Sequence, residues 1–302
     1  MISLKQEINQ LKQKKNAVIL AHYYVPDDVQ EIADYIGDSF YLSKIAKNIQ
    51  TDLVVFAGVS FMGESAKILN PQKKILLPDE HADCAMAHMA TVEKIKEMRE
   101  KYTDLAVVCY INSTAELKTM SDVCVTSSNA VKIVKKLPNK NIFFIPDENL
   151  GTYVAKQVQE KNVICNSGYC PVHKQINVEL VQKTKNEHKN ALFVAHPECT
   201  KEVLALADFV GSTSEIIDFV TNTENEEFII GTENGVMYEL MKQNPNKKFY
   251  PAMPKQYCED MKKVTLEKVR DALLYEQHEV HVDKQIGDLA IKALDKMLEL
   301  AK

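Results

Sequence analysis

The chain has 302 residues, of which 45% are hydrophobic and 26% are charged, as is usual for a globular protein with a large core. Its 37 basic and 42 acidic residues give a formal net charge of −5 without any basic block, which argues against a nucleic-acid groove. No stretch approaches a membrane span, and residues 1–16 have the pattern of an amphipathic helix rather than a signal peptide. We therefore expect a cytoplasmic protein with neither a membrane nor a nucleic-acid partner.

Short apolar runs recur along the chain at a fixed spacing. The run at 17–23 (AVILAHY) is matched 88 residues later by LAVVCYI and a further 86 residues later by ALFVAHP. Three other sets of segments keep the same spacings: 33–39, 121–127 and 207–213; 53–58, 141–146 and 227–232; 73–79, 161–167 and 247–253. Chance similarity between apolar runs would not preserve this register. The sequence therefore predicts three copies of one unit.

Each predicted unit alternates strands with helices. The helical patterns cover 40–49, 64–69, 92–101, 129–136, 152–160, 178–186, 215–220 and 236–242. This alternation predicts parallel sheets covered by helices, an α/β fold with three similar αβα domains. We expect the domains to comprise 1–83 with 259–302, then 84–169, then 170–258. Two further helical patterns, at 265–277 and 283–301, are expected to pack back on the first unit.

Two groups of three stand out among the seven cysteines. One group lies inside apolar runs, where a thiol packs as a small hydrophobic side chain: Cys109, Cys124 and Cys165. The other group follows such runs in polar, turn-rich sequence at spacings of 86 and 88 residues: Cys84, Cys170 and Cys258. One cysteine per unit does not supply the four closed ligands of structural zinc. The pattern favours an iron–sulfur cluster with one iron open to substrate.

Polar residues follow the first two strands of each unit, at the sheet edge where α/β proteins bind ligands. Those after the first strands are His22, Tyr110, Asn112, His196 and Glu198, and those after the second are Ser39, Ser127, Ser212 and Thr213. A structural interpretation is open for each, because a histidine can simply end a strand and a hydroxyl residue can cap a helix. Taken together, three helix N-termini on one rim instead predict a pocket for a ligand with several carboxylates or a phosphate. The two histidines with Glu198 also suit acid–base chemistry.

Nine short motifs, each weak alone, occur in order with the three spaced cysteines among them. They are AHYY (21–24), GDSFYLS (37–43), FAGVSFMGESAKIL (56–69), CYINSTAELK (109–118), TSSNA (126–130), PDENLG (146–151), AHPEC (195–199), GSTS (211–214) and GTENG (231–235). Over essentially its whole length the chain thereby resembles the quinolinate synthase family. The resemblance implies a pseudo-threefold arrangement of the three domains, with the active site at their junction.

The resemblance further implies one oxygen-sensitive 4Fe–4S cluster held by Cys84, Cys170 and Cys258. The implied reaction condenses iminoaspartate with dihydroxyacetone phosphate to quinolinate, with loss of phosphate and two waters, in de novo NAD biosynthesis. L-Aspartate oxidase is the implied supplier of the imine. The implied catalytic positions are Glu198, Tyr24, His22 and Tyr110. The expected substrate-binding positions are His22, Ser39, Tyr110, Asn112, Ser127, His173, Lys174, His196, Glu198 and Thr213, with His173 and Lys174 beside Cys170 facing an anionic ligand.

One departure from the family concerns a CxxCxxC run that some members carry at the third ligand. The corresponding positions here are Ala252, Lys255 and Cys258, which excludes a redox-switching disulfide in that run. Two other functions fit three cysteines from three related domains. One is a radical S-adenosylmethionine enzyme of the diphthamide type, and the other is an iron–sulfur sensor of an acidic metabolite. The AHYY, YIN and HPE segments favour quinolinate synthase over the radical enzyme, and no DNA-reading segment supports a sensor.

Overall fold

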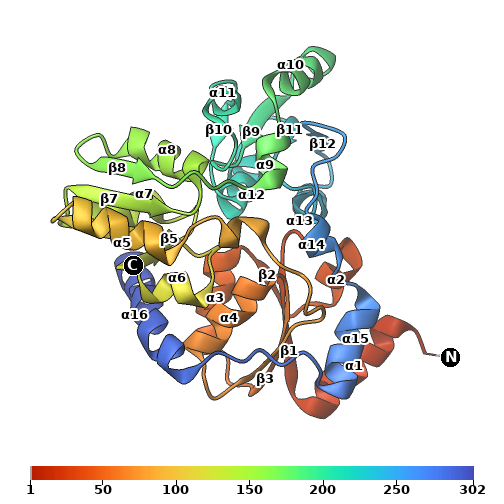
Figure 1. The fold of residues 1–302 in the computed structure, drawn as a ribbon. Helices are drawn as coiled ribbons and strands as arrows, with labels where there is room; N and C mark the ends of the chain where they lie inside the picture. Colours follow the sequence, from red (N-terminus) through yellow and green to blue (C-terminus); the bar gives the residue numbers. More distant parts are fainter. Residues whose placement is uncertain (1) are drawn as a thin grey trace.

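Three parallel sheets of four strands form the framework of the protein in the computed structural model, which describes residues 2–302 (Figure 1). Their strand orders are β2-β1-β3-β4, β6-β5-β7-β8 and β10-β9-β11-β12, so one topology occurs three times. The predicted α/β class with three similar αβα units is confirmed. The strands are β1 (Ala17–His22), β2 (Tyr35–Gly37), β3 (Leu53–Ala57), β4 (Lys74–Leu76), β5 (Leu105–Tyr110), β6 (Val123–Val125), β7 (Asn141–Ile145), β8 (Asn162–Cys165), β9 (Leu192–Ala195), β10 (Phe209–Val210), β11 (Glu227–Gly231) and β12 (Lys248–Pro251).

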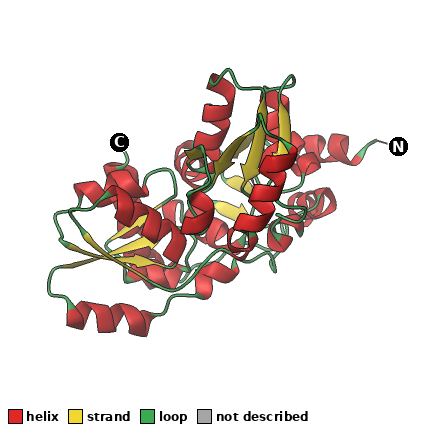
Figure 2. Ribbon diagram, turned by 90° about the horizontal axis from the view of Figure 1, so that it is seen from above, coloured by secondary structure: helices red, strands yellow, loops and turns green. Residues whose placement is uncertain are grey.

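Helices flank the three sheets (Figure 2). They are α1 (Leu4–Lys15), α2 (Asp27–Ile32), α3 (Ser39–Asn48), α4 (Ser60–Leu69), the 3₁₀ helix η1 (Ala85–His88), α5 (Val92–Lys101), α6 (Ala115–Thr119), α7 (Ala130–Lys136), α8 (Glu148–Gln157), α9 (Pro171–Gln175), α10 (Val178–Glu187), α11 (Lys201–Leu204), α12 (Thr213–Asn222), α13 (Val236–Gln243), α14 (Glu259–Lys262), α15 (Leu266–Tyr275) and α16 (Lys284–Leu300). The sequence pattern missed α2, α6, α9, α11 and α14, because four to six residues are too few to show a helical period. None of the helices within residues 2–302 has the length and apolar character to cross a bilayer.

The same side-chain contacts occur inside each of the three units, which explains why the polar motifs of the units repeat. In the first unit, Asp34 accepts a hydrogen bond from the main-chain N–H of Ile19 at 2.8 Å. It also forms an ion pair with Lys12 at 2.7 Å. The equivalent acids of the other units make the same two contacts. Asp122 accepts the N–H of Val107 and pairs with Arg99, and Asp208 accepts the N–H of Phe193 and pairs with Lys185. Each acid thereby ties the start of a second strand to the middle of the first. The repeated unit seen in the sequence is therefore a repeated structure.

The hydrophobic core is shared unequally among the units. One continuous cluster runs through the first two units and the tail helices. The third unit has two clusters of its own, one built around Phe193 and Ile229 and the other around Val194 and Phe228. These residue pairs alternate along β9 and β11, so the two clusters lie on opposite faces of the third sheet. The third unit therefore has a core separate from that of the other two.

The C-terminal tail joins the first unit to the second. Helix α15 packs against α1, as expected, and also contacts α2 and β3 (Figure 1). Helix α16 contacts α4 of the first unit, but it also packs along α6, α7 and β6 of the second. The tail therefore extends beyond the first unit, onto which it was expected to pack, and the proposed domain boundaries stay a prediction.

Packing of α16 predicts a large difference between two leucines on this helix. Leu294 is fully buried, whereas Leu289 is 49% exposed. Leu294→Ala is expected to lower the free energy of unfolding by roughly 2–5 kcal/mol, because a cavity replaces the buried side chain. Leu289→Ala serves as the matched control and should change it by no more than about 0.5 kcal/mol. Urea denaturation measures both, and equal midpoints for the two variants would contradict this packing.

Candidate metal centre and active site

One cavity collects residues from all three units at the carboxyl ends of their first strands. The cavity and its opening hold about 690 Å³ of space free of protein atoms. All of the site residues expected from the sequence line it except Lys174: His22, Tyr24, Ser39, Cys84, Tyr110, Asn112, Ser127, Cys170, His173, His196, Glu198, Thr213 and Cys258. Lys174 is exposed, and its ammonium lies 3.5 Å from the centroid of the Tyr169 ring. The structure therefore does not bring Lys174 to the site.

The three spaced cysteines have one local structure. Each is half-buried and immediately precedes a short helix: Cys84 before η1, Cys170 before α9 and Cys258 before α14. Burial raises the pKa of each thiol, to about 12 for Cys84, while main-chain N–H groups two or three residues further on act to lower it. These N–H groups do not meet full hydrogen-bond geometry with the thiols. They nevertheless lie where they would favour a thiolate, the form that binds a metal. The three sites therefore fit a metal cofactor.

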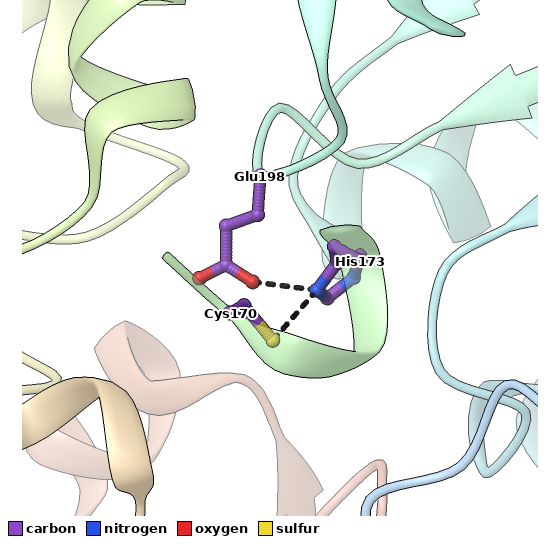
Figure 3. A group of neighbouring side chains, drawn as sticks. All are labelled: Cys170, His173 and Glu198. Atoms are coloured by element: carbon purple, nitrogen blue, oxygen red, sulfur yellow. Dashed lines mark hydrogen bonds and ion pairs between the residues drawn. The ribbon is translucent and has the colours of Figure 1, made fainter. Parts of the chain in front are cut away.

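His173 connects the middle cysteine to a buried carboxylate (Figure 3). Its Nδ1 lies 2.7 Å from Oε2 of Glu198 and 3.1 Å from Sγ of Cys170. One ligand atom from each of these three residues lies within 4.8 Å of the others, so they also form a possible metal-binding group. Because Nδ1 faces a carboxylate, it carries a proton and donates a hydrogen bond to Glu198. On the other side of the ring, Nε2 lies 2.9 Å from the hydroxyl of Thr232.

Glu198 is ionised in this environment and has an unused oxygen. Burial acts to raise the pKa of Glu198. The nearby imidazoles of His173 and His196 and the hydroxyl of Tyr110 have the larger, opposite effect and lower the pKa to about 2. The other carboxylate oxygen, Oε1, is buried without a hydrogen-bond partner, as is Oδ1 of Asn112. Buried polar atoms are rarely left unpaired. Two unpaired acceptors in the wall of one cavity are available to donors of a bound ligand or water.

The two strand-end histidines have matching orientations. Nδ1 of His22 accepts the main-chain N–H of Tyr24 at 3.2 Å, and Nδ1 of His196 accepts that of Glu198 at 3.3 Å. Burial lowers the pKa of both histidines to about 3, so both rings are neutral near pH 7. With Nδ1 accepting, the proton sits on Nε2. Both rings can therefore donate a hydrogen bond from Nε2, and the catalytic role expected for His22 stays a prediction.

Tyr24 and Tyr110 contribute phenol groups that stay protonated. The hydroxyl of Tyr24 lies 2.7 Å from that of Thr213 and 2.8 Å from that of Thr232. Burial and the charge of Glu198 raise the pKa of both tyrosines well above the ordinary value. Each tyrosine therefore acts as a hydrogen-bonding group rather than as a base. Thr232 joins Tyr24 to His173. It was not predicted as a site residue, because a hydroxyl within the GTENG segment gives no sign of its partners.

The three hydroxyl residues expected to begin helices do not share one role. Ser212 does cap α12, but the cap of α3 is Asp38, which precedes Ser39 and caps as well as serine does. Helix α7 follows Asn129, whose side chain does not cap the helix and instead accepts the main-chain N–H of Thr126 at 2.7 Å. Ser39 becomes the first residue of α3, and Ser127 lies two residues before Asn129. Their hydroxyl groups are therefore not used as helix caps, and both line the cavity.

Fold and site together indicate an enzyme for small molecules, built from three α/β units and with thiols that fit a metal cofactor. The family model described as Quinolinate synthetase A protein matches residues 6–299. The quinolinate synthase of Fusobacterium nucleatum subsp. nucleatum is 56% identical over 298 residues, 99% of this chain and 99% of that protein. Those of Caldicellulosiruptor saccharolyticus and Clostridioides difficile are 55% and 49% identical, over 99% of this chain and 98% of each protein. The chain belongs to the quinolinate synthetase A family.

Proposed function

We propose that this enzyme condenses iminoaspartate with dihydroxyacetone phosphate to form quinolinate, phosphate and two waters, as one step of NAD biosynthesis. The observation that carries the proposal is the cavity itself. It combines three thiols, two neutral imidazole donors and two unpaired buried acceptors, drawn from three units. The family and the names of the relatives support the same reaction. Its location in the cytoplasm, with L-aspartate oxidase as the supplier of the imine, is part of the proposal.

The substrates carry two carboxylates and one phosphate, and the cavity offers neutral donors to such anions. We assign these contacts to the imidazoles of His22 and His196 and to the hydroxyls of Ser39, Ser127 and Thr213. Neutral donors bind an anion without a compensating buried charge, and a charge-assisted hydrogen bond is roughly twice as strong as a neutral one. The unpaired Asn112 amide oxygen suits a donor on the substrate, such as the imine N–H.

The proposed cofactor is one 4Fe–4S cluster on Cys84, Cys170 and Cys258. Thiolates are the usual ligands of such clusters, and three of them reach one cavity here. When bound, the cluster supplies an iron without a protein thiolate, which can act as a Lewis acid. The protein's own proton acceptor is Glu198, whose Oε1 is free to accept a proton from the substrate. Tyr24 and Tyr110 donate hydrogen bonds to oxygen atoms that gain negative charge during dehydration and ring closure.

Anaerobic purification followed by two measurements on one sample tests the proposed function. Iron and inorganic sulfide are counted per chain, and quinolinate is assayed from iminoaspartate and dihydroxyacetone phosphate. We expect about four irons per chain and quinolinate formation. A cluster-replete sample that forms no quinolinate would refute the proposal. Formation of methylthioadenosine from S-adenosylmethionine would favour the diphthamide-type alternative, and a cluster without any turnover would favour a sensor.

Thr232 provides a prediction about how Tyr24 is held. Thr232→Val removes the hydroxyl that contacts both Tyr24 and His173, and it leaves two buried polar groups short of one partner each. An unsatisfied buried group costs roughly 1–3 kcal/mol, so we expect turnover to fall by about tenfold or more at unchanged iron content. Thr200→Val is the matched control, since the Thr200 hydroxyl does not cap α11. Wild-type turnover by Thr232→Val would show that this hydroxyl does not orient the site.

A further inference from the structure

Two buried carboxylates hold the main chain of two cluster cysteines. Oδ2 of Asp147 accepts the N–H of Cys170 at 3.2 Å, and Oε1 of Glu233 accepts the N–H of Cys258 at 3.0 Å. Both acids are buried, and Glu233 also lines the cavity. A buried carboxylate is costly unless its oxygens are well hydrogen-bonded, so these contacts are an integral part of the two cysteine loops.

The two acids occupy the same place in their units. Asp147 follows β7 and Glu233 follows β11, and they are 86 residues apart, one of the two repeat spacings. Each acid also accepts a main-chain N–H from two or three residues further along the chain. Oδ1 of Asp147 accepts the N–H of Leu150 at 2.6 Å, and Oε2 of Glu233 accepts that of Gly235 at 2.6 Å. Each carboxylate therefore joins the loop after the third strand to the cysteine loop after the fourth strand.

The first unit makes the corresponding connection differently. The residue at the equivalent position is Val59, which has no polar side chain. The next residue, Ser60, donates its hydroxyl to Asp83, the neighbour of Cys84. Here the carboxylate belongs to the cysteine loop, and its side chain is 44% exposed. All three cysteine loops are therefore tied to the loop after a third strand, but only the ties at Cys170 and Cys258 are fully buried.

Glu233 extends its tie to the first unit. Lys262 pairs with Oε1 of Glu233 at 2.9 Å and donates to the main-chain oxygen of Tyr24 at 2.6 Å. Through Lys262, the carboxylate of Glu233 therefore connects the main chain at Cys258 to the main chain at Tyr24. Asp147, by contrast, has main-chain N–H groups as its hydrogen-bond partners.

We propose that Asp147 and Glu233 are positioning residues that orient the loops of Cys170 and Cys258, so that their sulfurs face one centre before a metal binds. The inference rests on the proposed cluster and goes beyond it, because it assigns the preorganisation of the site to two residues that do not bind the metal. Groups that orient metal ligands typically contribute 10–100-fold to metal affinity. The same range is expected here for the rate at which the cluster is lost.

Four variants test the proposal: Asp147→Ala, Asp147→Asn, Glu233→Ala and Glu233→Gln. Iron transfer from the anaerobically purified protein to a chelator is followed by absorbance, and thermal unfolding of each metal-free protein is measured alongside. The alanine variants are expected to release iron roughly 10–100-fold faster than the wild type. The amide variants should fall in between, because an amide keeps one acceptor oxygen and replaces the other with a donor. Glu148→Gln, an exposed acid beside Asp147, is the matched control and should release iron at the wild-type rate.

The outcomes separate the inference from the proposed function. A wild-type protein that binds no iron would remove the proposed cluster and the inference with it. If the wild type binds a cluster, iron release at the wild-type rate from folded Asp147→Asn and Glu233→Gln would overturn the inference alone. A purely structural role predicts lower unfolding temperatures of the metal-free variants with unchanged iron release, and that result would also overturn it. The isosteric amide variants keep the test decisive if the alanine variants do not fold.

Discussion

Replacing Glu198 with glutamine is expected to lower the turnover of quinolinate formation by roughly a hundred- to ten-thousand-fold, the usual range for loss of a general acid–base group. The carboxylate has an unpaired oxygen in the cavity and is ionised near pH 7, since its pKa is lowered to about 2. Glutamine has nearly the same shape but cannot take up a proton. Its amide N–H₂ would also confront the Nδ1–H of His173 if it replaced the accepting Oε2.

The measurement is kcat of anaerobically prepared protein, corrected for iron content. Equal iron in the wild type and in Glu198→Gln separates loss of proton transfer from loss of the cluster. Glu202→Gln is the matched control, because Glu202 is an exposed acid in the same unit. Full turnover by Glu198→Gln with a complete cluster would show that another group moves the protons.

Repetition explains why so much of the fold could be predicted from one sequence. Four landmarks per unit keep spacings of 88 and 86 residues, and the structure shows the cause in the contacts of Asp34, Asp122 and Asp208. A side chain that must reach the same main-chain N–H in each unit cannot drift in register. Repetition also predicted that the three cysteines lie close together, because each follows the last strand of one of three similar units.

The interactions between units could not be predicted in this way, because they connect residues that have no fixed spacing. Thr232 matters through the hydroxyl of Tyr24 and the ring of His173, which come from two different units. Lys174 looked suitable beside Cys170, but the turn of α9 directs His173 into the cavity and leaves Lys174 exposed. The cap of α3 was misplaced for a local reason, since Asp38 competes with the neighbouring Ser39.

Similar positions carry different chemistry in the three units, and this is what makes the cavity a site for an asymmetric reaction. The first strands of the first two units end in His22 and Tyr110, and His196 directly follows that of the third. Two residues further on lie Tyr24, Asn112 and Glu198. A symmetric set of side chains would present the same group to every part of a ligand. Here the ionised acceptor, the amide and the phenol face one cavity from three directions. Two unlike substrates can therefore be held in a defined orientation.

Replacing Cys170 with serine is expected to reduce iron and sulfide to background levels and to make quinolinate formation undetectable. Cys170 is the middle of three thiols that reach one cavity, and a cluster with three protein ligands has none to spare. A serine hydroxyl remains protonated near neutral pH and is a harder ligand than a thiolate, so it does not replace the sulfur. Cys84→Ser and Cys258→Ser should behave in the same way, because each cysteine starts a short helix in equivalent surroundings.

Cys165→Ala is the matched control, since Cys165 ends β8 only five residues before Cys170 and does not line the cavity. This variant should keep its iron, its sulfide and most of its turnover, because its thiol contacts side chains outside the cavity, among them Thr152. Iron, sulfide and turnover are measured anaerobically on all four variants. Iron retained by Cys170→Ser would remove Cys170 from the ligand set. Loss of iron from Cys165→Ala to the same extent would show that a cysteine outside the cavity holds the cluster, and the three-thiol centre would then be wrong.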